Sequence, residues 1–72
     1  MKLHYYPETD SLYIELRRGA GIDVQEVGDG IVVDLNPAGN PVGIDIDGAS
    51  RRLDLTTLEL IALPAATTRL VG

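Results

Sequence analysis

Apolar and polar side chains alternate along three stretches of the chain, 12–16, 31–35 and 42–47. Alternation at period two is typical of half-buried strands that turn one face toward a core. The apolar members of the three stretches are Leu12, Ile14, Leu16, Ile31, Val33, Leu35, Val42, Ile44 and Ile46. Two further β-like runs lie before Pro7 and around Val24. The pattern therefore predicts a mainly β protein.

Turn-forming residues separate these runs at short intervals. Residues 7–10 (Pro-Glu-Thr-Asp) and 36–40 (Asn-Pro-Ala-Gly-Asn) each suit a hairpin loop, and Asp29-Gly30 is a strong hairpin signal because both residues tolerate positive φ. Residues 19–21 (Gly-Ala-Gly) link the second and third strands. Three hairpins in series predict an antiparallel β-meander of about five strands.

The three hairpin registers agree on one apolar face, because paired residues in a hairpin share a face. Symmetric closure of the first and last loops joins apolar residues only. The expected pairs are Tyr5–Leu12, Leu3–Ile14, Leu35–Val42, Val33–Ile44 and Ile31–Ile46. The middle hairpin adds Ile22, Val24 and Glu26 to the same face, and only Glu26 is discordant there.

A short helix is expected over residues 47–53, with Asp47 as its N-cap and with Ala49 and Leu53 four residues apart. In the following segment 54–63, residues up to Thr57 are expected to be helix or irregular chain. Residues 58–63 can be read as part of a helix opened by a capping box at Thr56 or as a strand, and Pro64 ends either form. Its apolar side chains must pack on the sheet or on another subunit. We predict as interaction residues Leu55, Leu58, Leu60, Ile61 and Leu63.

The length of 72 residues allows one domain, comprising a sheet-and-helix part over 2–53 and an apolar tail over 54–72 that is partly frayed. The chain has no cysteine, so disulfides cannot support its small core. Because one core of this size supplies only about 3–5 kcal/mol of net stability, we expect a homodimer or higher oligomer.

The opening Tyr5-Tyr6-Pro7-Glu8-Thr9-Asp10-Ser11-Leu12-Tyr13-Ile14 and the segments Gly30–Asn36, Val42–Ile46 and Ala49–Leu53 resemble the Domain of Unknown Function 2283 family of small prokaryotic proteins. The resemblance spans about residues 2–53. Asp45 stands where that family more often has Glu, and Asn36 where it more often has Asp. The resemblance implies a compact β-rich domain and no particular reaction or cofactor, and it suggests antitoxin-type binding of a toxin-like partner.

The face opposite the apolar one carries the candidate chemistry. His4, Tyr13 and Glu15 form a polar surface site of a kind that can transfer protons, although a solvated sheet face is the simpler interpretation. Asp34, Asp45 and Asp47 are the candidate ligands for a divalent cation. Residues 45–48 begin like a calcium loop, but Ser50 and Thr56 stand where that loop needs Gly and Glu. No catalytic residue and no cofactor is predicted, which favours a non-enzymatic role.

The formal net charge of −5 argues against nucleic acid and favours a basic protein as a partner other than the chain itself. No apolar run approaches the length of a membrane span and the N-terminus does not resemble a signal peptide, so we expect a cytoplasmic protein without a membrane partner. The leading hypothesis is a non-enzymatic, homo-oligomeric interaction module. The alternatives are an antitoxin-like binder of a basic toxin-type protein and a small metal-binding or hydrolytic protein that uses the acidic face.

Overall fold

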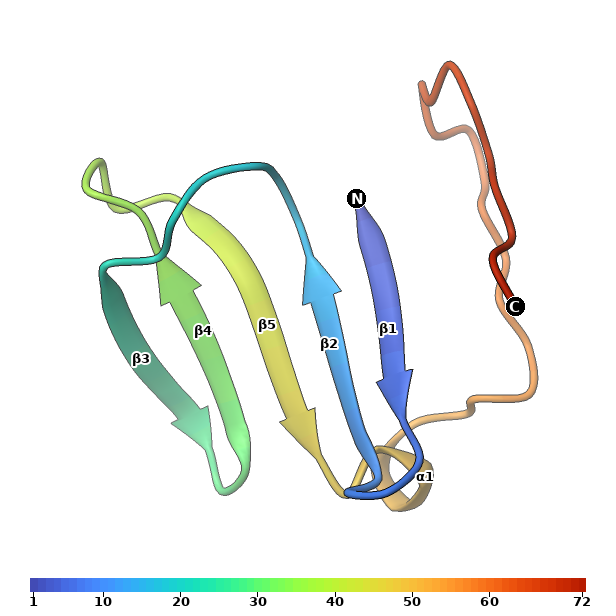
Figure 1. Ribbon diagram of the computed structural model, residues 1–72, viewed down its shortest axis with the longest axis horizontal. Helices are drawn as coiled ribbons and strands as arrows, with labels where there is room; N and C mark the ends of the chain where they lie inside the picture. Colours follow the sequence, from blue (N-terminus) through green and yellow to red (C-terminus); the bar gives the residue numbers. More distant parts are fainter.

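A computed structural model describes all residues 1–72, and it contains one antiparallel sheet of five strands and one short helix (Figure 1). The elements are β1 Lys2–Tyr6, β2 Ser11–Glu15, β3 Asp23–Gly28, β4 Ile31–Leu35, β5 Pro41–Asp47 and α1 Ala49–Arg52. The mainly β fold class, with five antiparallel strands and one short helix, is confirmed. No helix has both the length and the apolar composition that crossing a bilayer would need.

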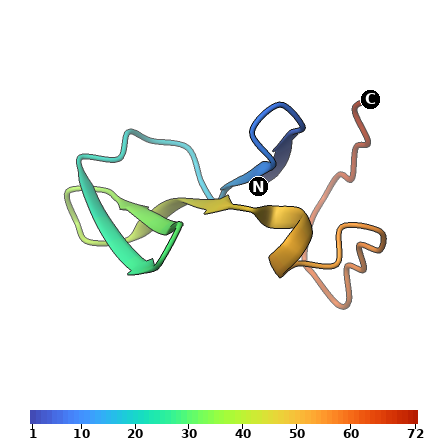
Figure 2. The same ribbon diagram turned by 90° about the horizontal axis from the view of Figure 1, so that it is seen from below.

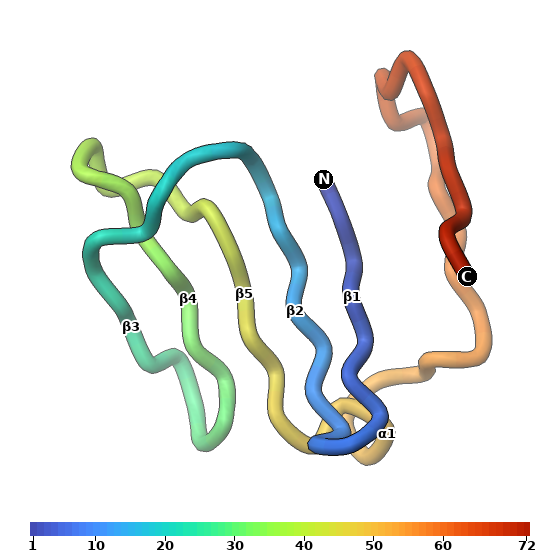
Figure 3. Tube along the Cα trace, viewed as in Figure 1, coloured from blue at the N-terminus to red at the C-terminus, as the bar shows by residue number.

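The order of the strands in the sheet is β1-β2-β5-β4-β3, which differs from the order of a meander. The three hairpins are present, but β2 pairs with β5 and the 16–22 connection crosses the end of the sheet to start β3 at the far edge (Figure 3). The side chains of β5 and β3 explain this strand order. β5 presents Ile44 and Ile46 to the apolar face and can be flanked on both sides, whereas β3 presents Asp23 and Gln25 and suits an edge.

The predicted pairs of the first hairpin are present, with Leu3 opposite Ile14 and Tyr5 opposite Leu12. In the last hairpin Ile31 pairs with Ile46 and Val33 with Ile44, as expected. The expected pairing of Leu35 with Val42 is wrong, because an irregularity after Asp34 places Leu35 opposite Pro41. One face of the sheet, hereafter the apolar face, therefore carries Leu3, Tyr5, Leu12, Ile14, Ile31, Val33, Leu35, Ile44 and Ile46.

The predicted register of the middle hairpin is wrong by one residue. Next to the turn, Gly28 lies opposite Ile31 as a two-residue Asp29-Gly30 turn requires, but a bulge then inserts one extra residue between Glu26 and Gly28. One extra residue moves every preceding side chain of β3 to the other face. Val24 pairs with Asp34 and Glu26 with Val32, so both lie on the polar face. The bulge thus removes Glu26 from the apolar face, at the cost of leaving Val24 64% exposed.

The helix α1 has four residues, and Gly48 occupies its N-cap position with a left-handed backbone (φ 63°). The prediction of Asp47 as the N-cap is wrong, since no side chain at that position caps the helix. Asp47 belongs to β5, and its carboxylate accepts a hydrogen bond from the Ser11 hydroxyl at 3.2 Å. Residues 54–63 form neither the helix nor the strand considered above.

The sheet has little cover on either face. Figure 2 shows it as a single layer, with α1 and the tail gathered toward the β1 side. The buried hydrophobic residues are Leu12, Val42, Ile46 and Ala49, and fifteen large hydrophobic residues are exposed. The apolar positions of β4 remain only half-buried. The isolated chain therefore leaves much of its apolar surface in contact with water.

Candidate functional site

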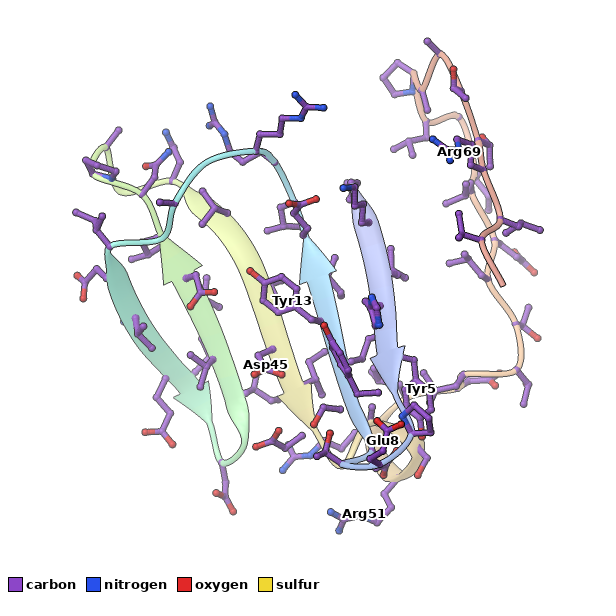
Figure 4. All side chains as sticks on the ribbon, viewed as in Figure 1. Tyr5, Glu8, Tyr13, Asp45, Arg51 and Arg69 are labelled. Carbon is purple, nitrogen blue, oxygen red and sulfur yellow. The ribbon has the colours of Figure 1, made fainter.

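The polar face of the sheet is organised around Tyr13. This residue projects from β2, and its ring lies across β5 toward β4 (Figure 4). The phenol donates a hydrogen bond to the Asp34 carboxylate at 3.2 Å. Gly43 of β5 lies beneath the ring, and a Cβ at this glycine would come within 2.6 Å of the Tyr13 Cζ. The absence of a side chain at Gly43 is therefore what allows the ring to reach across the sheet.

Acidic residues crowd around this tyrosine. Burial raises the pKa of the Tyr13 phenol first, and the hydrogen bond to Asp34 and the charges of Glu15 and Asp45 raise it further. The pKa of Asp45 is also raised, first by burial and then by the charges of Asp47 and Asp34. Tyr13 therefore remains a neutral donor at physiological pH. The negative charges of Asp47 and Asp34 oppose the ionisation of the Asp45 carboxyl group.

We expect Asp45→Asn to stabilise the protein slightly at neutral pH. A carboxyl pKa that is raised in the folded state costs stability when the group is ionised, and this cost falls as the pH drops through the raised pKa. Because the side chain is exposed, solvent screening limits the gain to about 0.5 kcal/mol. Urea unfolding at low ionic strength measures this gain, which should shrink in high salt. Glu8→Gln, in the β1–β2 turn, is the control, and an equal gain there would contradict the proposed crowding.

The structure places Asp34 and Asp45 on one face of neighbouring strands, as expected, and Asp47 follows on the same face of β5. No group of three or more His, Asp or Glu side chains in the structure is arranged to hold a metal ion. The side chain of Asp45 is exposed, so water screens part of the repulsion between these carboxylates.

The predicted polar surface site is brought together only in part. His4 pairs with Tyr13 across β1 and β2, and its ring stacks on Tyr6 with centroids 4.2 Å apart. Glu15 forms an ion pair with Lys2 at 3.7 Å, with the side chain of Lys2 80% exposed. The contact of the His4 ring is thus with Tyr6 of its own strand rather than with the Glu15 carboxylate.

A second polar cluster joins parts of the chain that lie forty residues apart. The Asp10 carboxylate accepts hydrogen bonds from the Tyr5 hydroxyl at 2.8 Å, the Ser50 hydroxyl at 2.7 Å and the Ser50 backbone N–H at 3.0 Å. The Asp10 carbonyl also accepts the Ala49 N–H at 2.9 Å. We call this cluster of Tyr5, Asp10 and Ser50 the latch, because it holds the start of α1 against the β1–β2 turn.

Sequence reasoning placed Asp10 in the hairpin loop 7–10 and predicted no contact between it and Ser50. The structure shows that its carboxylate supplies the cap that α1 lacks locally. Asp10 adopts φ 52°, a left-handed conformation that Asp tolerates better than most residues. The signal for this contact lay in the resemblance itself, since both Asp10 and Ser50 belong to the segments that carry it.

The predicted interaction residues fall into two groups. Leu55 and Leu58 line a groove of about 580 Å³ together with Leu3, Tyr5 and Leu12 of the apolar face. Farther along, Leu60 and Leu63 border a second groove along β1. Ile61 is 79% exposed, and all five residues of the set remain exposed. The tail thus approaches the β1 side of the sheet without burying its own side chains.

Comparison with known proteins gives one match. No curated protein and no solved structure matches the chain. The family model described as "Protein of unknown function (DUF2283)" matches residues 2–50, which include every strand and the start of α1. The match also includes both ends of the latch, Asp10 and Ser50, and the tail lies beyond it. Because the match covers more than half of the chain, the protein belongs to the DUF2283 family.

Proposed function

We propose that the protein is a non-enzymatic interaction module that associates with copies of itself. The observation that supports this proposal most strongly is the uncovered apolar surface of the single chain. Its sheet is one layer, its buried hydrophobic residues number only four, and the apolar-face positions Ile31, Val33 and Leu35 of β4 are only half-buried. A sheet face of this kind is stable when a second layer covers it.

The size of the apolar face suits a second copy. Five strands at a spacing of about 4.8 Å and five residues at a rise of about 3.3 Å give a face of roughly 24 by 17 Å. This area of roughly 400 Å² is about half of the ~800 Å² that each partner contributes to a stable interface, so the tail must contribute a similar share. Stacking two apolar faces about 10 Å apart would form a β-sandwich.

The opposite polar face does not compete for this role. It carries Asp34, Asp45 and Asp47, and two copies that met through it would place like charges together. We therefore assign the contact between copies to the apolar face, with β4 and β5 at its centre because the tail already approaches β1 and β2.

Two matched substitutions test the proposal. Val33 lies on the apolar face of β4, and Val24 lies on the polar face of the adjacent β3. We expect the wild-type chain to show twice the 7.7 kDa of one copy by light scattering. Val33→Lys should raise the dimer Kd at least tenfold, because a charge would be buried between two sheets. Val24→Lys should leave the Kd unchanged.

Circular dichroism of both variants shows whether the sheet persists. A wild-type chain that stays at 7.7 kDa up to about 100 μM would overturn the proposal. Equal weakening by the two lysines would overturn the assignment to the apolar face.

A further inference from the structure

The two edges of the sheet differ in how they are protected. β3 carries a bulge before Gly28 and turns Asp23 and Gln25 toward the apolar face, two devices that discourage the addition of another strand. β1 is regular over its five paired residues, has no bulge, and carries Leu3 and Tyr5 on its apolar side, 49% and 40% exposed. β1 is therefore the edge that can accept a further strand.

A segment with the properties of a strand lies beside this edge. Residues 58–61 contain neither helix, turn nor bend, and no hydrogen bond between two backbone groups involves any residue after Leu53. Leu58 and Leu60 border the groove along β1, whereas the intervening Glu59 and the following Ile61 do not. This is the alternation of an extended strand, and it ends at Ala62, which has a left-handed backbone (φ 55°).

The connector to this segment is long enough to reach another chain. α1 ends at Arg52 with Leu53 as its C-cap, and residues 54–57 separate Leu53 from Leu58. Four residues span at most about 14 Å, and two stacked sheets lie about 10 Å apart. The tail begins at the α1 end of the sheet and runs alongside β1 (Figure 1). A small reorientation of the connector would therefore carry residues 58–61 from one sheet to the other.

We propose that residues 58–61 of each copy add as a sixth strand to β1 of a second copy, so that the dimer exchanges its tails. This inference rests on the proposed self-association and specifies its geometry. The added strand gives the tail backbone the hydrogen bonds that it lacks in the single chain. It also places Leu58 and Leu60 beside Leu3 and Tyr5 on the apolar face, and it closes the unprotected edge of β1.

Proline substitutions test the strand without removing much apolar surface. Successive residues of a strand direct their N–H groups to opposite sides, so one of Glu59→Pro and Leu60→Pro must remove a hydrogen bond to β1. We expect that one variant to raise the dimer Kd at least tenfold. Leu60→Ala controls for the lost side chain, and Thr67→Pro is a matched proline farther along the tail. None of these changes should alter the fold of the single chain, because residues 59, 60 and 67 make no backbone hydrogen bond.

Cysteine pairing shows which chain receives the tail. The protein has no native cysteine, so introduced thiols report without background. We expect oxidation of a mixture of His4→Cys and Glu59→Cys chains to give a disulfide between two chains, and Val24→Cys mixed with Glu59→Cys to give none. A chain with both His4→Cys and Glu59→Cys that oxidises to a monomer would show pairing within one chain and overturn the exchange.

The outcomes separate the two proposals. A wild-type chain that is monomeric contradicts self-association itself. A dimer that Val33→Lys weakens but neither proline affects contradicts the added strand and leaves the self-association proposal standing.

Discussion

Asp10→Asn should lower the thermal unfolding midpoint of this protein more than any other single exchange of an acid for its amide. The carboxylate of Asp10 accepts three hydrogen bonds, from the Tyr5 hydroxyl and from both the hydroxyl and the backbone N–H of Ser50. An amide offers only one acceptor oxygen, so at least one of these donors would lose its partner. For a domain of this size we expect a fall of at least about 5 °C, measured by circular dichroism. The asparagine keeps the tolerance of the left-handed backbone at position 10, so strain does not confuse the result.

The matched control for this prediction is Asp54→Asn. The Asp54 carboxylate also accepts a backbone N–H and a hydroxyl, but both belong to Thr56, two residues away. A local turn of this kind restrains little of the chain, whereas the latch holds segments that are forty residues apart. Tyr5→Phe and Ser50→Ala should each lower the midpoint less than Asp10→Asn, because each removes one donor. A midpoint for Asp10→Asn no lower than that for Asp54→Asn would show that the latch does not stabilise the fold.

The latch also predicts how the protein responds to acid. The hydrogen bonds from Ser50 and then from Tyr5 lower the pKa of Asp10 below its ordinary value of 3.8. The stabilisation is therefore complete above 3.8 and is lost as the pH falls through the lowered pKa. The Asp10→Asn variant has no carboxyl group to protonate at this position, so this part of the loss of stability in acid should be absent. Thermal melts between pH 5 and pH 2 therefore provide a second measurement of the same interaction, and an unchanged acid limb would contradict it.

The sequence predicted the strands well because their signal is local. Alternating apolar residues and the Asp29-Gly30 turn depend on neighbours within a few positions, and the pairs Val33–Ile44 and Leu3–Ile14 follow from them. The order of the strands could not be derived in this way. The order depends on which strand can pair with a neighbour on both of its edges. The unsuitability of β3 for such a position becomes clear only when Asp23 and Gln25 are known to lie on the apolar face.

The remaining errors have two physical origins, a single inserted residue and a contact between residues distant in sequence. The bulge in β3 reverses the faces of Val24 and Glu26, and the discordance of Glu26 was the visible sign of it. The cap of α1 comes from Asp10 rather than from Asp47, because a residue forty positions away occupies the place that a local cap would take. On the polar face, the reach of Tyr13 over Gly43 required a side-chain conformation that no pattern of alternation contains.

Gly43→Ala should destabilise the protein through Tyr13. The new Cβ would lie within 2.6 Å of Tyr13 Cζ, so the ring must move away and lose its hydrogen bond to Asp34. Overpacking and the lost bond together cost roughly 1–2 kcal/mol, a large part of the ~3–5 kcal/mol that such a core supplies. Urea unfolding measures the change in the free energy of unfolding.

A double-mutant cycle with Tyr13→Ala isolates this contact, because removing the ring leaves room for the new methyl group. Gly43 lies in a strand, where alanine is intrinsically favoured over glycine by roughly 0.5–1 kcal/mol. In the Tyr13→Ala background, Gly43→Ala should therefore stabilise the protein, and the coupling between the two sites should reach about 2 kcal/mol. Tyr13→Phe keeps the ring and removes only the phenol, so Gly43→Ala should remain destabilising beside it. If Gly43→Ala lowered the free energy of unfolding equally in the wild-type, Tyr13→Ala and Tyr13→Phe backgrounds, the prediction would be wrong. The backbone of the strand, rather than the Tyr13 ring, would then require the glycine.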